Sequence, residues 1–231
     1  MATVKRLLCL ANSRKLSGRC IAGREFIGGR PGAWIRVVSA REREEVSEYE
    51  RQYEDGSDPR VLDIVEVPLL EPRPRGFQQE NWLLDPSRYW VRVGRARWSE
   101  LEMVVDPPEP LWLDGFHSFS VMNDRVPLDE AASLRSSLRL LRVPKLHLSV
   151  LASDEASGNS KRRVQGRFRH GAKEHQLWLT DPAYERAFLA RADGEYALGE
   201  CFLTISLGEA FNDACYKLIA AIIEPPPGRR P

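Results

Sequence analysis

The chain has 231 residues, of which 42% are hydrophobic and 29% charged, and its formal net charge is +1. These values are typical of a globular protein with one large domain or two small ones, and they exclude a disordered or fibrous chain. No apolar run approaches the roughly 18 residues of a membrane helix. Residues 11–15, of which all but Ala11 are polar or charged, interrupt any apolar core of a signal peptide. We therefore expect a cytoplasmic protein with no membrane partner.

Charged residues are gathered in blocks along the N-terminal half. Residues 1–43 carry ten basic and two acidic side chains, whereas residues 44–66 carry nine acidic and two basic ones. A nearly neutral chain of this kind can present a basic face to an anionic partner. Most basic residues are arginine, which suits bidentate contacts with phosphates and bases, although a GC-rich genome would produce the same bias.

The four cysteines do not indicate a metal site or a disulfide. No two of them form a Cys-x-x-Cys pair, and each lies in or beside an apolar stretch, where a reduced cysteine acts as a small hydrophobic residue. They are Cys9, Cys20, Cys201 and Cys215. We expect no metal and no cofactor.

The N-terminal half shows four predicted strands around one predicted helix, followed by a less distinct fifth strand. The helix is expected in the charged segment Arg41–Tyr53, which ends at Asp55-Gly56. An insertion at residues 71–88, with several prolines, separates the last two strands. The expected strands are Arg6–Ala11, Arg19–Phe26, Ala33–Ser39, Val61–Leu70 and Tyr89–Arg97.

A connector is expected at residues 106–137. It begins with three prolines within residues 106–110, a composition typical of a loop. A short helix is predicted inside it, at Leu128–Leu138.

The C-terminal half has clearer strand patterns, because its apolar and polar residues alternate with period two. Its helix is predicted at Ala183–Arg191, after Thr180-Asp181-Pro182, which supplies a capping residue and a proline at the first helical position. The expected strands are Lys145–Ser153, Arg163–Arg169, Gln176–Thr180, Cys201–Leu207 and Tyr216–Glu224.

In both halves the predicted order is β-β-β-α-β-β, with the helix between the third and fourth strands. This is the order of an OB-fold, a five-stranded Greek-key barrel that often binds oligonucleotides. The expected fold is therefore mainly β, with two tandem OB-like five-stranded barrels. The predicted domains are 1–105 and 138–231, joined by the connector 106–137.

The strongest local signal is a basic strand in the C-terminal half. Residues 161–173 contain six basic side chains and no acidic one. With Phe168 turned inward, alternation places Arg163, Arg167 and Arg169 on the outer face, beside an outward Trp178 on the next strand. Arginines that meet phosphates and a ring that stacks on bases suit single-stranded nucleic acid. The alternative is an edge strand whose charges protect it from aggregation.

The N-terminal half repeats this pattern more weakly. Arg14 and Lys15 are expected in the loop between the first two strands, which borders the ligand groove of an OB-fold. Trp34 and Arg36 are expected to point outward from the third strand. The alternative for the loop is a simple polar turn. The glycine-rich run Gly28–Gly32 lacks the ending of a P-loop and predicts a hairpin turn.

Several segments resemble bacterial dual OB domain-containing proteins. They are Lys5–Gly23, Trp34–Arg36, Asp63–Pro68 and the tail Leu207–Leu218. The resemblance implies two OB barrels, a nucleic-acid-binding role and a place in bacterial conflict or defence systems, and it supplies no catalytic residues. Val37 stands where the family pattern has a proline, a difference expected to affect strand geometry more than function.

Signals for an enzyme are poor. The four histidines show no metal-ligand spacing, and neither a Gly-x-Ser-x-Gly elbow nor a His-x-Glu deaminase signature is present. The acidic residues between 44 and 55 fit a charged helix face better than a magnesium site. We expect a non-enzymatic protein that binds nucleic acid, with DNA and RNA both open. The alternatives are a protein-interaction module and, less favoured, an enzyme with an unrecognised site between the barrels.

Overall fold

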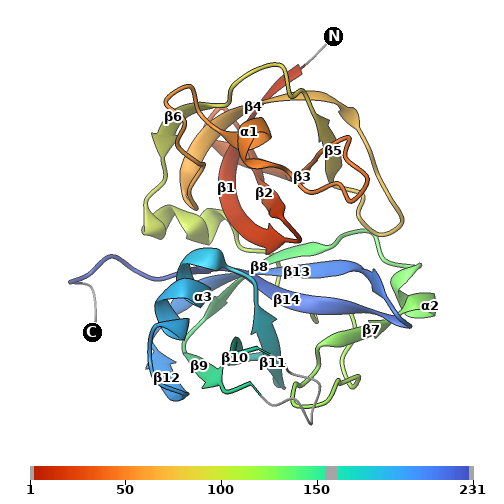
Figure 1. The fold of residues 1–231 in the computed structure, drawn as a ribbon, viewed down its shortest axis with the longest axis vertical. Helices are drawn as coiled ribbons and strands as arrows, with labels where there is room; N and C mark the ends of the chain where they lie inside the picture. Colours follow the sequence, from red (N-terminus) through yellow and green to blue (C-terminus); the bar gives the residue numbers. More distant parts are fainter. Residues whose placement is uncertain (1–2, 154–160, 229–231) are drawn as a thin grey trace. The chain divides into compact units, whose positions relative to one another are not determined.

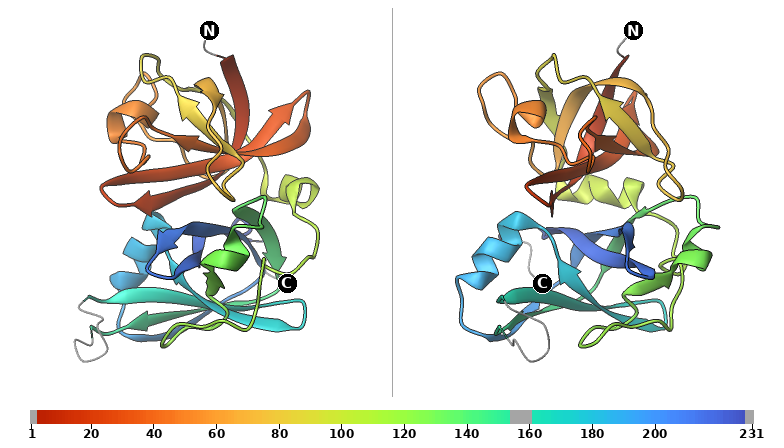
Figure 2. Two further views of the ribbon diagram at one scale, coloured as in Figure 1. Left: turned by 90° about the vertical axis from the view of Figure 1, so that its right-hand side faces the viewer. Right: turned by 45° about the vertical axis from the view of Figure 1, so that its right-hand side comes forward.

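The computed structural model describes residues 3–153 and 161–228, and most of their regular structure is β-strand. The chain divides into two compact units. Unit 1 contains residues 1–104 and 134–138, and unit 2 contains residues 105–133 and 139–231. Figures 1 and 2 show the elements of both units.

Unit 1 contains a closed barrel with OB topology. Its strands follow the order β1-β2-β3-β5-β4, and β4 pairs back to β1. The pair β3–β5 is parallel and the other pairs are antiparallel. The first half of β1 pairs with β4 and the second half with β2, so this long strand closes the barrel (Figure 1). The strands are β1 (Thr3–Lys15), β2 (Gly18–Ile27), β3 (Arg30–Val38), β4 (Asp63–Pro72), β5 (Asn81–Leu84) and β6 (Val91–Arg95).

The fifth barrel strand differs from the predicted one. It is β5, which lies inside the predicted insertion and pairs with β3 and β4. The predicted strand Tyr89–Arg97 contains β6, which instead pairs with the beginning of β4, at Asp63–Glu66, whereas β5 pairs with the end of β4. β5 was not predicted because it has only four residues, too few to show a clear alternation.

The predicted helix Arg41–Tyr53 is also shorter than expected. Only α1 (Glu48–Arg51) is helical, and Ser47 begins it with a capping box formed with Glu50. Upstream, the backbone of Val46 exchanges two hydrogen bonds with that of Arg19 in β2. The segment before α1 therefore pairs with the barrel, and charged composition alone did not predict this. The position of α1 between β3 and β4 agrees with the OB order.

Unit 2 contains a second barrel of the same topology. The sheet follows the order β12-β9-β10-β11-β14-β13-β8, with β11 and β14 parallel. Its strands and its longest helix are β8 (Leu138–Val143), β9 (Leu146–Leu151), β10 (Arg163–His170), β11 (Lys173–Leu179), α3 (Pro182–Leu189), β12 (Gly194–Leu198), β13 (Cys201–Phe211) and β14 (Ala214–Ile223).

The first strand of the second barrel is in two pieces. β8 lies beside β13, and β9 pairs with β10, so together they match the two halves of β1. Pro144 separates the pieces, as expected of a residue that cannot donate a ladder hydrogen bond. Both units thus have the predicted mainly β, OB-type fold.

The helix α3 begins as the sequence predicts. Asp181 accepts hydrogen bonds from the backbone of Ala183 and Tyr184, and Pro182 occupies the first turn. On its buried side, Phe188 packs into the barrel core with apolar residues of β9, β10 and β14. In the described part of the chain, no helix is long and apolar enough to span a membrane.

The predicted connector is divided between the two units. Residues 105–133 belong to unit 2, where β7 (Arg125–Pro127) pairs with β14 and is followed by α2 (Leu128–Ala131). Residues 134–138 belong to unit 1. A 3₁₀ helix, η1 (Trp98–Val104), ends at the point where the chain first passes from unit 1 to unit 2. The units are therefore not the two contiguous segments that the sequence analysis expects.

Candidate nucleic-acid interface

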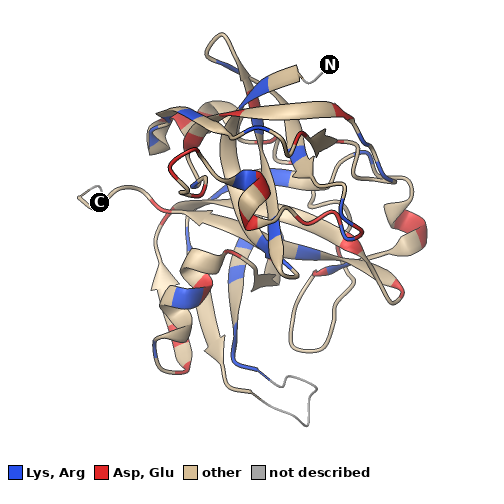
Figure 3. Cartoon of the chain, turned by 45° about the horizontal axis from the view of Figure 1, so that its top comes forward, with Lys and Arg blue, Asp and Glu red and all other residues tan. Residues whose placement is uncertain are grey.

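The outer face of β10 and β11 carries the basic row predicted from the sequence. Along β10, Val164 and Phe168 are buried in the core, so Arg163, Arg167 and Arg169 lie on the opposite face. Gly166 also points inward, because a Cβ there would overlap the side chain of Ile219. Lys and Arg colour much of β10 in Figure 3.

Arg163 and Trp178 form the best-defined contact on this face. The guanidinium carbon of Arg163 lies 3.7 Å from the centroid of the Trp178 ring. Trp178 is half-buried and sits opposite Gln165 in the β10–β11 ladder. A cation–π contact of this kind contributes about 0.5–2 kcal/mol, and it holds a planar guanidinium against the sheet.

The other two arginines have looser surroundings. Arg167 forms ion pairs of 3.6 Å with Glu174 and 3.9 Å with Glu195. Arg169 is exposed, as are Lys161 and Lys173 at the two ends of the basic segment. Surface ion pairs contribute only about 0–1 kcal/mol, so an anionic ligand can displace the two carboxylates from Arg167 at little cost.

A loop that the sequence analysis assigned to the connector crosses this face. We call residues 115–124 the arch. The carbonyl oxygen of Ser120 accepts hydrogen bonds from Gln165 Nε2 at 3.0 Å and from Gln176 Nε2 at 3.2 Å. Met122 pairs with the backbone of Gln176 through two hydrogen bonds. The centre of the outer face is therefore covered by the chain's own backbone.

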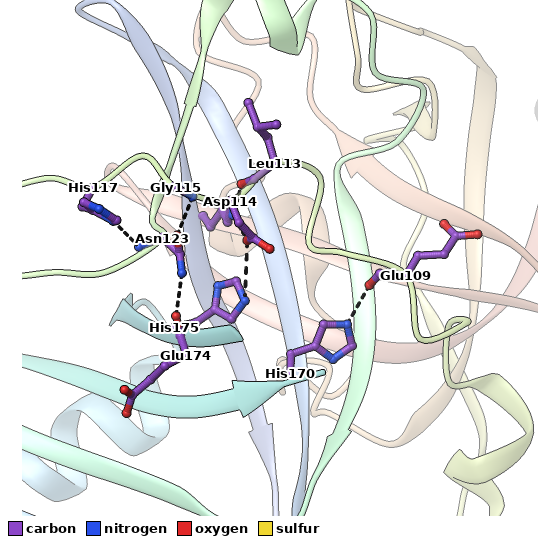
Figure 4. Close-up of polar contacts among 10 residues, drawn as sticks. Glu109, Leu113, Asp114, Gly115, His117, Asn123, His170, Glu174 and His175 are labelled. Atoms are coloured by element: carbon purple, nitrogen blue, oxygen red, sulfur yellow. Dashed lines mark hydrogen bonds and ion pairs between the residues drawn. The ribbon is translucent and has the colours of Figure 1, made fainter. Parts of the chain in front are cut away.

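A buried polar cluster holds the base of the arch (Figure 4). Lys217 Nζ donates to the carbonyl oxygen of Leu113 at 2.5 Å and lies 3.3 Å from Asp114 Oδ1. His175 Nε2 lies 3.7 Å from the same carboxylate oxygen, and its ring stacks on Phe168 with centroids 5.4 Å apart. Neither Lys217 nor His175 is exposed to solvent.

Burial sets the protonation of this cluster. It lowers the pKa of His175 to about 4, with a further lowering by the positive charge of Lys217, so the imidazole is neutral at pH 7. Burial also lowers the pKa of Lys217, and the carboxylate of Asp114 opposes this effect. Because Lys217 is enclosed and bonded to Leu113, we assign the cluster a structural role in anchoring the arch.

The predicted site residues of unit 1 lie in different surroundings. Arg14 is exposed and Lys15 half-buried, but both belong to β1. The predicted loop is a two-residue hairpin turn, Leu16-Ser17, because Lys15 pairs with Gly18. The expected groove-bordering loop is therefore absent from unit 1 as described.

Trp34 and Arg36 are buried, contrary to the expectation that they point into solvent. Trp34 is 8% exposed and lies under the guanidinium of Arg24 at 5.0 Å. Arg36 is 5% exposed and donates to Ser137 Oγ at 2.6 Å, with Glu80 at 3.7 Å. Alternation places both on the outer side of β3, but residues 134–138, distant in sequence, cover Arg36.

The structure thus brings together four of the eight predicted residues, namely Arg163, Arg167, Arg169 and Trp178, on one face of unit 2. The arch and the two glutamines that hold it, Gln165 and Gln176, were not predicted from the sequence. Only the composition of residues 115–124, which include one glycine, two serines and two phenylalanines, could have indicated an ordered loop. Among the described residues, no group of three or more His, Cys, Asp or Glu is arranged to hold a metal ion.

Comparison with known proteins agrees with this architecture. A family model described as a dual OB-containing domain matches residues 5–222, which is nearly the whole chain. No match was found among curated proteins or among solved structures.

Proposed function

Because the chain belongs to the dual OB-containing domain family, we propose that it binds single-stranded nucleic acid through the outer face of β10 and β11. The observation that carries this proposal is the stack of Arg163 on Trp178, in line with Arg167 and Arg169 along one strand. The face between the second and third strands is the usual ligand face of an OB-fold.

The chemistry of this face matches an unpaired nucleic-acid strand. Bases of single strands stack on aromatic rings and on the planes of arginine guanidinium groups. The Arg163 guanidinium, whose carbon lies 3.7 Å from the centroid of the Trp178 ring, offers such a plane together with a positive charge. Arg167 and Arg169 lie on the same face and supply charge for the phosphates that follow.

Unit 1 supports this function less well. Trp34 and Arg36 are enclosed by the chain itself, and Arg36 already serves a buried carboxylate and a hydroxyl. Releasing such a buried arginine would leave an unpaired charge in Glu80, at a cost of about 3–5 kcal/mol. The proposed interface is therefore confined to unit 2.

The proposal is tested by changing the three arginines together to glutamine in the full-length chain. Affinity for labelled DNA and RNA oligonucleotides of about 15 nucleotides, near the upper site size of one OB-fold, is measured between about 50 and 200 mM salt. If each arginine contacts one phosphate, the slope of log affinity against log salt should flatten by about 0.7 per contact. Trp178→Ala should weaken binding by about 1–3 kcal/mol with an unchanged slope, because stacking releases no counterions.

A matched control removes the same net charge from unit 1. Arg30, Arg43 and Arg88 are all exposed, and their triple glutamine variant should keep the slope of the parent. Equal effects of the two triple variants would show only a general charge effect. If the β10 variant and Trp178→Ala both bind like the parent, this face does not bind nucleic acid and the protein-interaction alternative becomes the better one.

A further inference from the structure

Phe119 is the most exposed residue of the arch among its large apolar side chains. Its exposed fraction is 81%, compared with 44% for Phe116 and 38% for Met122. It immediately precedes Ser120, whose carbonyl oxygen is bonded to Gln165 and Gln176. Gln165 is the ladder partner of Trp178. Phe119 is therefore presented next to the proposed interface.

The arch is held in one conformation by many contacts. Asn123 accepts a hydrogen bond from the backbone of Gly115 at 2.7 Å and donates one to the carbonyl oxygen of Glu174 at 2.7 Å. The backbone of Ser118 donates to Asp124 Oδ1, also at 2.7 Å. Val121, two residues after Phe119, is buried. An aromatic ring left exposed on a loop so well fixed loses little entropy when a ligand covers it.

The point at which the arch contacts β10 determines which residues a bound ligand would meet. Gln165, which Ser120 contacts, lies between Arg163 and Arg167 on the strand. A nucleic-acid strand that contacts Arg163 at one end and Arg167 and Arg169 at the other passes Gln165 and therefore comes close to Ser120 of the arch. The exposed side chain next to Ser120 is Phe119.

We propose that Phe119 is a second base-stacking residue, which binds a base of the same strand as it passes the arch between Arg163 and Arg167. This inference rests on the proposed function and adds a binding residue from a segment that precedes the barrel strands in the sequence. The basic side chains on both sides of the arch favour a polyanionic ligand over an apolar protein segment. The ring supplies a π-face that accepts any base.

The test compares four variants of the full-length chain by oligonucleotide affinity at two salt concentrations. Phe119→Ala should weaken binding roughly 5- to 150-fold, as expected for one lost base stack, and the salt slope should stay unchanged. Phe119→Leu should be about as weak as the alanine variant, whereas Phe119→Trp should bind at least as well as the parent. Phe211→Ala is the matched control. Phe211 is 67% exposed and lies in β13, a strand that pairs with neither β10 nor β11, so this variant should bind like the parent.

The outcomes separate this inference from the proposed function. If Trp178→Ala is weakened while Phe119→Ala binds like the parent, the interface stands and the role of Phe119 is overturned. If Phe119→Leu keeps the parent's affinity, the ring acts as apolar surface and the stacking role is overturned. If neither the parent nor any variant binds an oligonucleotide, the proposed function fails, and this inference fails with it.

Discussion

Two arginine–tryptophan contacts lie on the outer faces of the two barrels, and they differ in what covers them. Arg24 lies over Trp34 at 5.0 Å and Arg163 over Trp178 at 3.7 Å. Trp34 is nearly enclosed, whereas Trp178 keeps part of its surface in solvent. The same pair of residue types is thus enclosed in unit 1 and partly exposed in unit 2.

At the same scale, His175 should make the protein less stable in mild acid. Its pKa is lowered to about 4 by burial and by Lys217, whereas in the unfolded chain an imidazole has its usual pKa of about 6.5. As the pH falls from 6.5 towards 4, the unfolded chain binds a proton that the folded chain does not. The free energy of unfolding therefore decreases over this range.

The measurement is urea unfolding at a series of pH values, for the parent and for His175→Phe. The phenylalanine keeps a ring against Phe168 and removes the titrating group, so the variant's stability should fall less steeply between pH 6.5 and 4. Parallel curves for the parent and His175→Phe would show that His175 is not the group responsible.

Among the elements, the arch should loosen when its internal hydrogen bonds are removed. Asn123 has a φ of 53°, so Asn123→Gly removes the side-chain bonds to Gly115 and Glu174 without adding backbone strain. Gly115 is exposed and Glu174 half-buried, so water can satisfy the groups left behind, and each lost hydrogen bond should cost only about 0.5–1.5 kcal/mol. Amide hydrogen exchange in residues 115–124 should become faster, while β13 and β14 keep their protection. Unchanged exchange in the arch would mean that the contacts of Ser120 and Met122 suffice to hold it.

How well each element could be predicted depends on how local its signal is. β10, β11 and α3 follow from alternation and from the Asp181-Pro182 cap, both visible within a few residues. β5 is defined by pairing with β3 and β4, which no local pattern records.

The features of the candidate site also differ in how well the sequence predicts them. Alternation correctly gives the face on which Arg36 and Arg163 lie, because side-chain direction is a property of the strand itself. Whether that face is covered depends on segments distant in sequence, residues 134–138 for Arg36 and the arch for Gln165. For this reason the sequence predicted the basic row, but neither the burial of Arg36 nor the role of the arch.

At the scale of the whole molecule, the division of the chain into two units predicts which fragments of unit 1 will be less stable. Residues 1–104 lack Ser137, which contacts Arg36 and Glu80 in unit 1 through its hydroxyl and backbone amide. A fragment of residues 1–104 should therefore unfold at a lower urea concentration than one of residues 1–138. Fluorescence of Trp34, Trp82 and Trp90 reports the transition.

A third fragment tests the contribution of the Ser137 side chain separately from that of the rest of residues 134–138. Residues 1–138 with Ser137→Ala lose the hydroxyl but keep the amide that donates to Glu80 at 3.0 Å, so their midpoint should fall between the other two. Identical midpoints for all three fragments would show that residues 134–138 add nothing to the stability of unit 1.

The interrupted path of unit 1 also has a consequence during synthesis of the chain. A ribosome that has completed residue 104 must add the next 29 residues, which belong to unit 2, before the segment 134–138 is made. At about 5–20 residues per second, this delay lasts roughly 1.5–6 s. Strands of the first barrel that pair during that interval do so without Ser137, the partner of Arg36 and Glu80, so the outer side of β3 stays uncovered at Arg36 until residues 134–138 are made.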